Sequence, residues 1–276
     1  MAIVRFIWRS CLILVLLLWS GEAQAGQLAD RLAQFPYWES KPPVTTADGD
    51  LLYPDWMEGT WKVTSTLIAQ VAPLAPELVT PGFESNRRYL NQPVSFLVRF
   101  QAVNDSISAM SDRILRFLPS TTQGSYQGNS FVKPNTPAVV ADRAFNGLNI
   151  SKAYLGDHQI RSVKVDPNSP NRQITALRNG HQLISVVTGR ASETPSSDQF
   201  IATEVSTQVF RGTTQPYFNE VETTTAYQLR QSPNLAIKAL QVTAIYLSPQ
   251  EADYFKAHGK PVALYRYTAT DHIEPL

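Results

Sequence analysis

Residues 199–211, QFIATEVSTQVFR, decide the fold class, because apolar and polar side chains alternate along them. Ile201, Val205 and Val209 occupy one set of alternate positions, and Glu204 and Gln208 occupy the other. Successive side chains of a β-strand point to opposite faces of the sheet. The pattern therefore predicts a strand with one apolar and one polar face.

Similar runs recur along most of the chain, and the segments between them favour tight turns. Residues 166–171 (DPNSPN) and Asn179-Gly180 are typical of hairpin connections, which make consecutive strands antiparallel neighbours. No strand–helix–strand rhythm appears, which excludes a parallel α/β sheet. We predict a mainly β fold, an antiparallel up-and-down barrel, with a two-sheet sandwich as the alternative. The expected strands are 61–68, 94–102, 138–153, 159–166, 172–179, 181–190, 199–211, 217–230, 235–247 and 261–270.

The first residues predict export from the cytoplasm. Arg5 and Arg9 precede the apolar run CLILVLLLW at 11–19, and Ala23-Gln24-Ala25 is a small-x-small cleavage pattern. The run is too short to span a bilayer, so we predict a signal peptide at 1–25, with an uncleaved anchor as the alternative.

The residues that follow predict a leader at 26–58 and a barrel domain at 59–276. Leu28, Leu32 and Phe35 form one apolar stripe of a short helix in the leader. We expect the leader to pack across the outside of the barrel or to act as a spacer.

A second helix is predicted near the C-terminus, at Pro249–His258. Ser248 is a suitable N-cap, Glu251 completes a capping box, and Gly259 ends the helix.

Composition excludes several classes of function. The sequence has 24 basic and 23 acidic side chains, and removal of 1–25 takes away two arginines and one glutamate, so the mature chain is balanced. This balance predicts no nucleic-acid partner. Cys11 is the only cysteine and lies in the signal, so we expect no disulfide-linked partner and no cysteine metal ligand.

No catalytic or metal-binding motif is present, so we assign no catalytic residue, no metal and no cofactor, and we do not favour an enzyme. The four histidines are scattered along the chain. Glu220 and Glu222 share one strand face, which would suit a carboxylate pair, but we expect that face to meet solvent.

Two stretches carry a resemblance to known families. YPDWMEGTWKVTSTL, at 53–67, places Gly59-x-Trp61 at the start of a strand, and VAPLAPELVTPGFESNRRYLNQPVSF follows at 71–96. Together with the predicted C-terminal helix, this resembles the lipocalin or wider calycin barrel. The amino-acid sequence of these two stretches also resembles an uncharacterised cyanobacterial family with chloroplast-lumen relatives. The resemblance implies a periplasmic or thylakoid-lumen location.

In lipocalins the Gly-x-Trp tryptophan lies at the closed end of the barrel beneath an arginine. The resemblance therefore implies that Trp61 marks barrel closure. Here the segment before the predicted helix has no arginine, and Arg266 on the last strand is the nearest substitute. Our hypothesis is that Arg266 stacks on Trp61.

The predicted inner face combines threonines with apolar residues. Hydroxyls inside a barrel need partners from protein, water or ligand. We therefore predict a partly polar ligand cavity, with a packed interior of mutually bonded threonines as the alternative. The candidate ligand-binding residues are Trp61, Thr203, Thr207, Thr223, Thr225 and Tyr227.

Residues 81–89 form a candidate lid or docking surface. Phe83 and Tyr89 are its apolar anchors, and Arg87 and Arg88 are its anion contacts. Our first functional hypothesis is a binding protein for a hydrophobic small molecule that is apolar or amphipathic. The alternative is an assembly or stability factor that contacts a membrane-protein complex. A calycin-type enzyme is a third class, for which no residue set argues.

Overall fold

The computed structural model describes residues 26–103, 138–212, 215–231 and 236–273 of the 276-residue chain. The predicted signal peptide at 1–25 lies outside the described residues. The helices are α2 (Gln27–Ala33) and α4 (Arg143–Leu155), with 3₁₀ turns η1 (Asp55–Met57), η2 (Glu84–Tyr89) and η3 (Tyr254–Ala257). The strands are β1 (Thr45–Thr46), β2 (Leu52–Tyr53), β3 (Gly59–Val71), β4 (Pro93–Val103), β5 (Ala138–Ala141), β6 (Ile160–Asp166), β7 (Ser169–Leu177), β8 (Gln182–Ser196), β9 (Gln199–Arg211), β10 (Tyr217–Arg230), β11 (Ala236–Leu247) and β12 (Ala263–Ile273).

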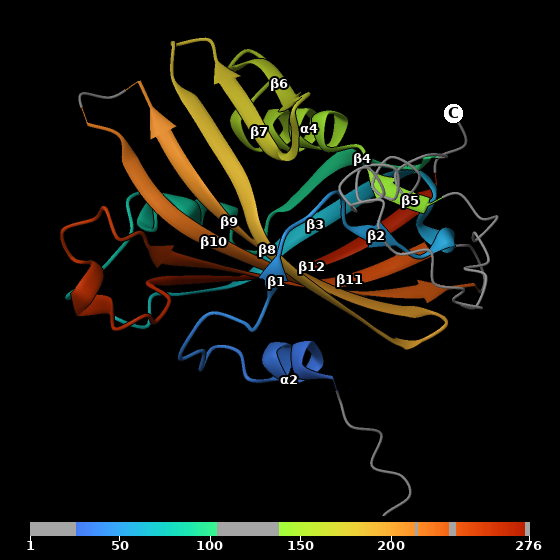
Figure 1. The fold of residues 1–276 in the computed structure, drawn as a ribbon, viewed down its shortest axis with the longest axis horizontal. Coiled ribbons are helices and arrows are strands. Elements are labelled where there is room, and N and C mark those ends of the chain that lie inside the picture. Colours follow the sequence, from blue (N-terminus) through green and yellow to red (C-terminus); the bar gives the residue numbers. More distant parts are fainter. Residues whose placement is uncertain (1–25, 104–137, 213–214, 232–235, 274–276) are drawn as a thin grey trace, which may run out of the picture.

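The strands form one curled antiparallel sheet, which confirms the predicted mainly β class and makes the sandwich alternative wrong (Figure 1). The order is β2-β5-β4-β3-β12-β11-β10-β9-β8-β7-β6, and β1 pairs with β8. Strands β6 to β12 pair in sequence order, and β12 then pairs with β3. This is the cyclic order of an up-and-down barrel. In the described residues the ring is open between β2 and β6, the two ends of this order, so the sheet is a half-barrel.

Helix α4 occupies this opening, where the sequence predicted a strand at 138–153. Only β5 is extended there, so the prediction was wrong beyond Ala141. The chain turns helical because Asp142 caps the helix, its side chain accepting a hydrogen bond of 3.0 Å from the Phe145 backbone N–H. On one side, Asn146 bonds the backbone of Arg99 on β4 through both its amide atoms, at 2.6 and 3.1 Å.

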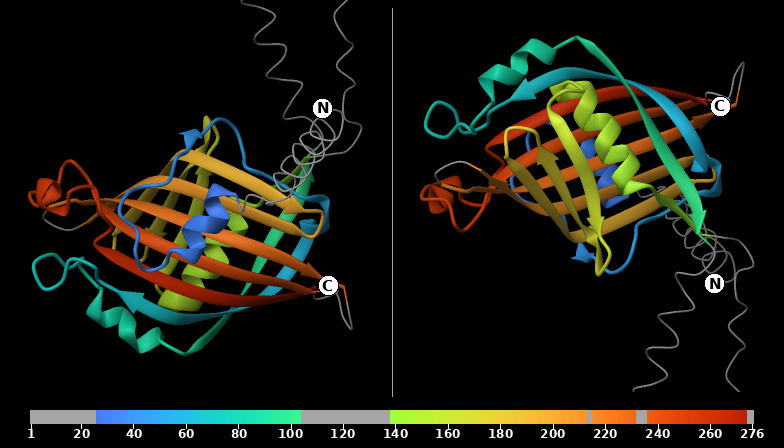
Figure 2. Two further views of the ribbon diagram at one scale, coloured as in Figure 1. Left: turned by 90° about the horizontal axis from the view of Figure 1, so that it is seen from below. Right: turned by 90° about the horizontal axis from the view of Figure 1, so that it is seen from above.

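The other side of α4 packs on β6 and β7 through a glycine. A Cβ at Gly147 would lie 2.7 Å from Gln173 Nε2 and 3.0 Å from Val163 Cγ1, so a larger residue would displace the end of the Gln173 side chain. Figure 2 shows α4 over the concave face of the sheet, with α2 on the opposite, convex face.

Trp61 fills one end of the half-barrel and is fully buried. Its Nε1 donates to the Met57 carbonyl at 2.8 Å, and it packs in a cluster that includes Phe100 and Phe200. The predicted stacking of Arg266 on Trp61 is wrong. Arg266 pairs with Ala69, eight residues along β3 from Trp61 and therefore roughly 27 Å away.

Arg266 also lies on the other face of the sheet from Trp61. Its guanidinium lies 5.3 Å from the ring of Phe35, in the leader on the convex side. Arg266 therefore contacts the leader on the convex face of the half-barrel and does not cover Trp61.

The predicted helix at Pro249–His258 is reduced to the short turn η3. The capping box does not form because the Glu251 carboxylate accepts a hydrogen bond of 2.9 Å from the Phe218 backbone N–H on β10. The Ser248 hydroxyl contacts the Gln250 side chain. Without these caps the segment follows successive turns along the sheet end.

The leader places its apolar stripe on the convex face. Leu28 and Leu32 of α2, together with Trp38, pack against Val242 and Tyr246 on β11. The leader therefore covers the convex face of the central strands, and α4 lies on the concave side, where it packs on β4, β6 and β7. None of the described helices is long and apolar enough to cross a bilayer.

Candidate ligand-binding site

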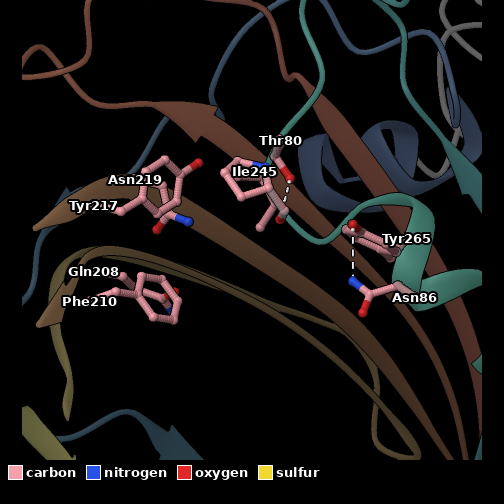
Figure 3. Close-up of a pocket in the computed structure, with 9 residues that line it drawn as sticks. Thr80, Asn86, Gln208, Phe210, Tyr217, Asn219, Ile245 and Tyr265 are labelled. Atoms are coloured by element: carbon pink, nitrogen blue, oxygen red, sulfur yellow. Dashed lines mark hydrogen bonds between the residues drawn. The ribbon is translucent and has the colours of Figure 1, made fainter. Parts of the chain in front are cut away.

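A pocket of about 420 Å³ lies on the concave face, at the end of the strands opposite Trp61 (Figure 3). Its walls are aromatic and apolar, with Phe210 and Tyr217 at the β9–β10 end and Ile245 and Tyr265 on β11 and β12. The alternation that buries Val221 on the concave face also brings Asn219 and Tyr217, two and four residues earlier, to the pocket.

The loop after β3 covers one side of this pocket. Phe83 is buried with its ring centre 6.0 Å from that of Tyr265, and its carbonyl accepts from Gln70 Nε2 at 2.5 Å. Asn86 Nδ2 donates to the Tyr265 hydroxyl at 3.3 Å. These contacts fix Thr80 and Asn86 in the pocket wall.

One polar atom in the wall, Asn219 Oδ1, is buried and accepts no hydrogen bond from the described residues. The buried Tyr217 hydroxyl makes no hydrogen bond of good geometry, but the Asn219 side chain lies close enough to it to act against the rise of the Tyr217 pKa. The Asn219 residue is only 5% exposed. Burial raises the pKa of Tyr217, so its phenol stays neutral at physiological pH. Unpaired buried polar atoms are rare in folded proteins, and a ligand that bonds them would remove their cost.

A smaller pocket of about 240 Å³ lies beside the first and shares Thr80, Pro81 and Tyr217 with it. Glu251 lines this second pocket and is held by the Phe218 N–H. The negative charge of Glu251 adds to burial in raising the pKa of Tyr217. The Glu251 carboxylate therefore acts on Tyr217, which lines both pockets.

The predicted threonines do not form one site. Cα pairing of Thr224 with Thr203 and of Glu220 with Thr207 places Thr203 and Thr207 on the convex face, under the leader. Three other predicted ligand-binding residues point to the concave face, between the pocket and the Trp61 cluster. They are Thr223, Thr225 and Tyr227. Neither they nor Trp61 line the pocket.

Thr203 belongs to a buried polar network on the convex face. The Thr224 hydroxyl lies 2.8 Å from both Thr203 Oγ1 and Glu222 Oε1. Glu222 accepts two hydrogen bonds from the Arg31 guanidinium, at 2.6 and 2.7 Å, and one from the Tyr246 hydroxyl at 2.9 Å. The alternative to a cavity was a packed interior with mutually bonded threonines; the bond between Thr203 and Thr224 lies outside the interior, on the convex face, and does not decide between the two.

Glu220 and Glu222 share a face, as predicted, but that face does not meet solvent. Glu222 is fully buried, and Glu220 forms an ion pair with Lys41 of the leader. The expectation of a solvent-facing edge was wrong because the leader covers it. Within the described chain, no group of three His, Cys, Asp or Glu side chains could hold a metal ion.

The loop residues predicted as contacts divide into anchors and exposed charges. Phe83 is buried and the Tyr89 hydroxyl donates to the Tyr154 carbonyl of α4 at 2.7 Å, so both hold the loop in place. Arg87 pairs with Glu84 at the surface, and Arg88 donates to the Tyr89 hydroxyl at 3.0 Å.

Sequence reasoning missed most of the residues that line the pocket. Among them, Gln208, Tyr217 and Asn219 lie on the two strands with the clearest alternation. They follow the same two-residue period as the predicted strands, and an amide among apolar neighbours was the available signal. The pattern does not say which end of the strand is hollow.

The fold and pocket define a class, a curled antiparallel half-barrel with one filled end and one hollow end. The chain belongs to the family described as Domain of unknown function (DUF6816), which matches residues 45–270. The match begins at β1 and so includes every strand, while α2 lies before it. No curated protein and no solved structure matches the chain.

Proposed function

We propose that this protein binds an apolar or amphipathic small molecule in the pocket at the hollow end of the half-barrel. The observation that carries the proposal is Asn219 Oδ1, a buried acceptor without a partner in a wall that contains three aromatic rings. The volume of about 420 Å³ is within the range of roughly 300–1,000 Å³ that is usual for small-molecule pockets.

The pocket is built on rigid elements, which supports binding without large rearrangement. Its walls come from β9, β10, β11 and β12, whose backbones are paired over their full length around the pocket. The covering loop is fastened at Phe83 and Asn86. A preformed pocket loses little ordering entropy on binding.

We also propose that the domain is a distant relative of the calycins and that it acts after export, in the periplasm or thylakoid lumen. The cyclic strand order and Trp61 at the filled end support the relationship. The apolar run at 11–19 supports export.

The test is stoichiometric binding of N-phenyl-1-naphthylamine, an uncharged hydrophobic fluorophore. We expect one molecule per chain in the native protein. Gln208→Trp fills the pocket and should abolish the fluorescence gain. Thr207 comes directly before Gln208 on β9 but points to the convex face. The Thr207→Trp variant is therefore the matched control and should bind the probe as the native protein does. Absence of probe binding by the native chain would refute the proposal.

A second function, contact with a membrane-protein complex, is favoured by two exposed apolar side chains. Phe255 is 83% exposed, and Val79 beside the smaller pocket is also exposed. Such a partner should co-purify with the native chain. Phe255→Ser, or charge reversal at Arg87 and Arg88, should release it, and unchanged co-purification by both variants would exclude these contacts.

A further inference from the structure

We propose, resting on the function proposed above, that the pocket selects an uncharged ring compound that donates a hydrogen bond, and that it rejects anions. This assigns a chemical class to the ligand. Three features of the pocket support this selection, namely its neutral wall, the unpaired acceptor Asn219 Oδ1 and a nearby carboxylate.

The wall of the pocket contains no ionised side chain. The lining residues are three aromatics, three amides, a threonine, a proline and an isoleucine. Burial raises the pKa of both Tyr217 and Tyr265, so these phenols stay neutral. A charged ligand would lose hydration there without meeting an opposite charge in the wall itself, which is unfavourable. The nearest carboxylate, Glu251, lies in the adjoining pocket, where the Phe218 N–H already bonds it. The rings of Phe210, Tyr217 and Tyr265 offer flat surfaces that suit a ring.

The acceptor Asn219 Oδ1 defines where the donor of the ligand would lie. Asn219 is on β10 between Tyr217 and Val221, and its partner across the strand pair is Gln208, which also lines the pocket. A hydroxyl or N–H group bonded to Oδ1 would satisfy a buried atom that the protein itself leaves unpaired. A ligand without a donor would leave that cost in place.

The carboxylate of Glu251 makes the same site hostile to anions. Glu251 lines the adjoining pocket behind Tyr217, and the Phe218 N–H holds it at 2.9 Å. Like charges repel more strongly in a partly buried site than in bulk water. A carboxylate or sulfonate in the pocket would therefore be opposed by both desolvation and repulsion.

Four matched naphthalenes test this selection with the full chain by isothermal titration calorimetry. 2-Naphthol is neutral and has a donor, 2-methoxynaphthalene has no donor, 2-naphthoate is an anion, and 2-naphthylmethylammonium is a cation. We expect 2-naphthol to bind about tenfold more tightly than 2-methoxynaphthalene, the effect of one satisfied buried acceptor. Both ions should bind at least about tenfold more weakly than 2-naphthol.

Two variants locate the selection in named residues. Asn219→Leu should bring the affinities of 2-naphthol and 2-methoxynaphthalene to about the same value, because it removes the acceptor without adding bulk. Glu251→Gln keeps the acceptor for the Phe218 N–H but removes the charge, so it should strengthen 2-naphthoate binding. Glu58→Gln, at the filled end of the barrel, is the matched control and should change nothing.

The outcomes separate this inference from the proposed function. If the native chain binds N-phenyl-1-naphthylamine but binds 2-naphthoate or the ammonium compound as tightly as 2-naphthol, the selectivity is wrong and the pocket still binds ligands. Equal affinities of 2-naphthol and 2-methoxynaphthalene would likewise overturn it. If neither N-phenyl-1-naphthylamine nor any of the four naphthalenes binds, the proposed function itself fails. These native-chain results decide the matter even if a variant does not fold.

Discussion

Replacement of Arg31 by alanine should strongly destabilise the protein, because Arg31 is the counter-charge of the buried Glu222. Arg31 in α2 donates to Glu222 through Nε and Nη2, and its Nη2 also lies 2.9 Å from the Tyr246 hydroxyl. Its guanidinium lies 4.0 Å from the Trp38 ring. The substitution would leave a fully buried carboxylate without a counter-charge.

The magnitude follows from the burial of the two partners. The Glu222 side chain is 0% exposed and the Arg31 side chain is 11% exposed. Removal of one partner from a buried ion pair costs roughly 3–5 kcal/mol. Because some water reaches Arg31, we take the lower end, about 3 kcal/mol. For a domain of this size that corresponds to a decrease in Tm of roughly 6–12 °C.

Thermal unfolding followed by circular dichroism measures this decrease. Arg87→Ala is the matched control, because Arg87 forms an ion pair with Glu84 over the same 2.6 Å but at the surface, and its Tm should not change. Arg31→Met combined with Glu222→Leu should recover most of the lost stability, since it replaces the buried pair by apolar groups.

The reasoning would be refuted by an Arg31→Ala protein with the Tm of the Arg87→Ala control and an unchanged Trp38 environment. Trp38 is buried beside Arg31, and its indole N–H donates to the Arg31 carbonyl at 2.7 Å. Detachment of the leader alone would shift the tryptophan emission to longer wavelength. If neither the Tm nor the tryptophan emission changed, the ion pair between Arg31 and Glu222 would contribute nothing to stability.

Three further predictions concern the filled end, the buried phenols and the seam helix. Trp61→Ala should lower the free energy of unfolding in urea by about 3–5 kcal/mol, because it empties the centre of the Trp61 cluster; a loss below 1 kcal/mol would contradict this packing. Burial raises the pKa of Tyr53 and Tyr246, so their contribution to stability is complete below the unfolded value of about 10 and is lost as pH rises above it. The Tm should therefore fall above about pH 10, and a Tm that is flat through this range would argue against buried phenols. Asp142→Ala should cost about 1 kcal/mol and increase hydrogen exchange in α4, whereas the exposed Asp157→Ala should not; equal exchange in both variants would exclude the cap.

The sequence by itself determined the strands and their antiparallel neighbours. Alternation along 199–211 and 217–230 predicted β9 and β10, because side chains of period two can bury one face only in an extended chain. The Asn179-Gly180 turn predicted the β7–β8 hairpin, and Gly180 has the positive φ of 85° that such turns require.

Tertiary structure decided which face is inside and where the barrel opens. Thr203 and Thr223 both lie among apolar residues, yet they point to opposite faces, Thr203 to the convex face under the leader and Thr223 to the concave face. A period of two distinguishes the faces without assigning them when both are buried. The strand predicted at 138–153 would have closed the ring, but the Asp142 cap and the contact of Asn146 with β4 made it a helix.

The pocket was likewise decided by contacts between distant segments. Trp61 fills one end because β2, β5 and the ends of β9 and β10 converge on it, and Asn219 lies at the other end, where no side chain of the described chain reaches its oxygen. Local patterning specifies the conformation of each strand, whereas a cavity depends on side chains that come from the whole length of the chain and do not meet.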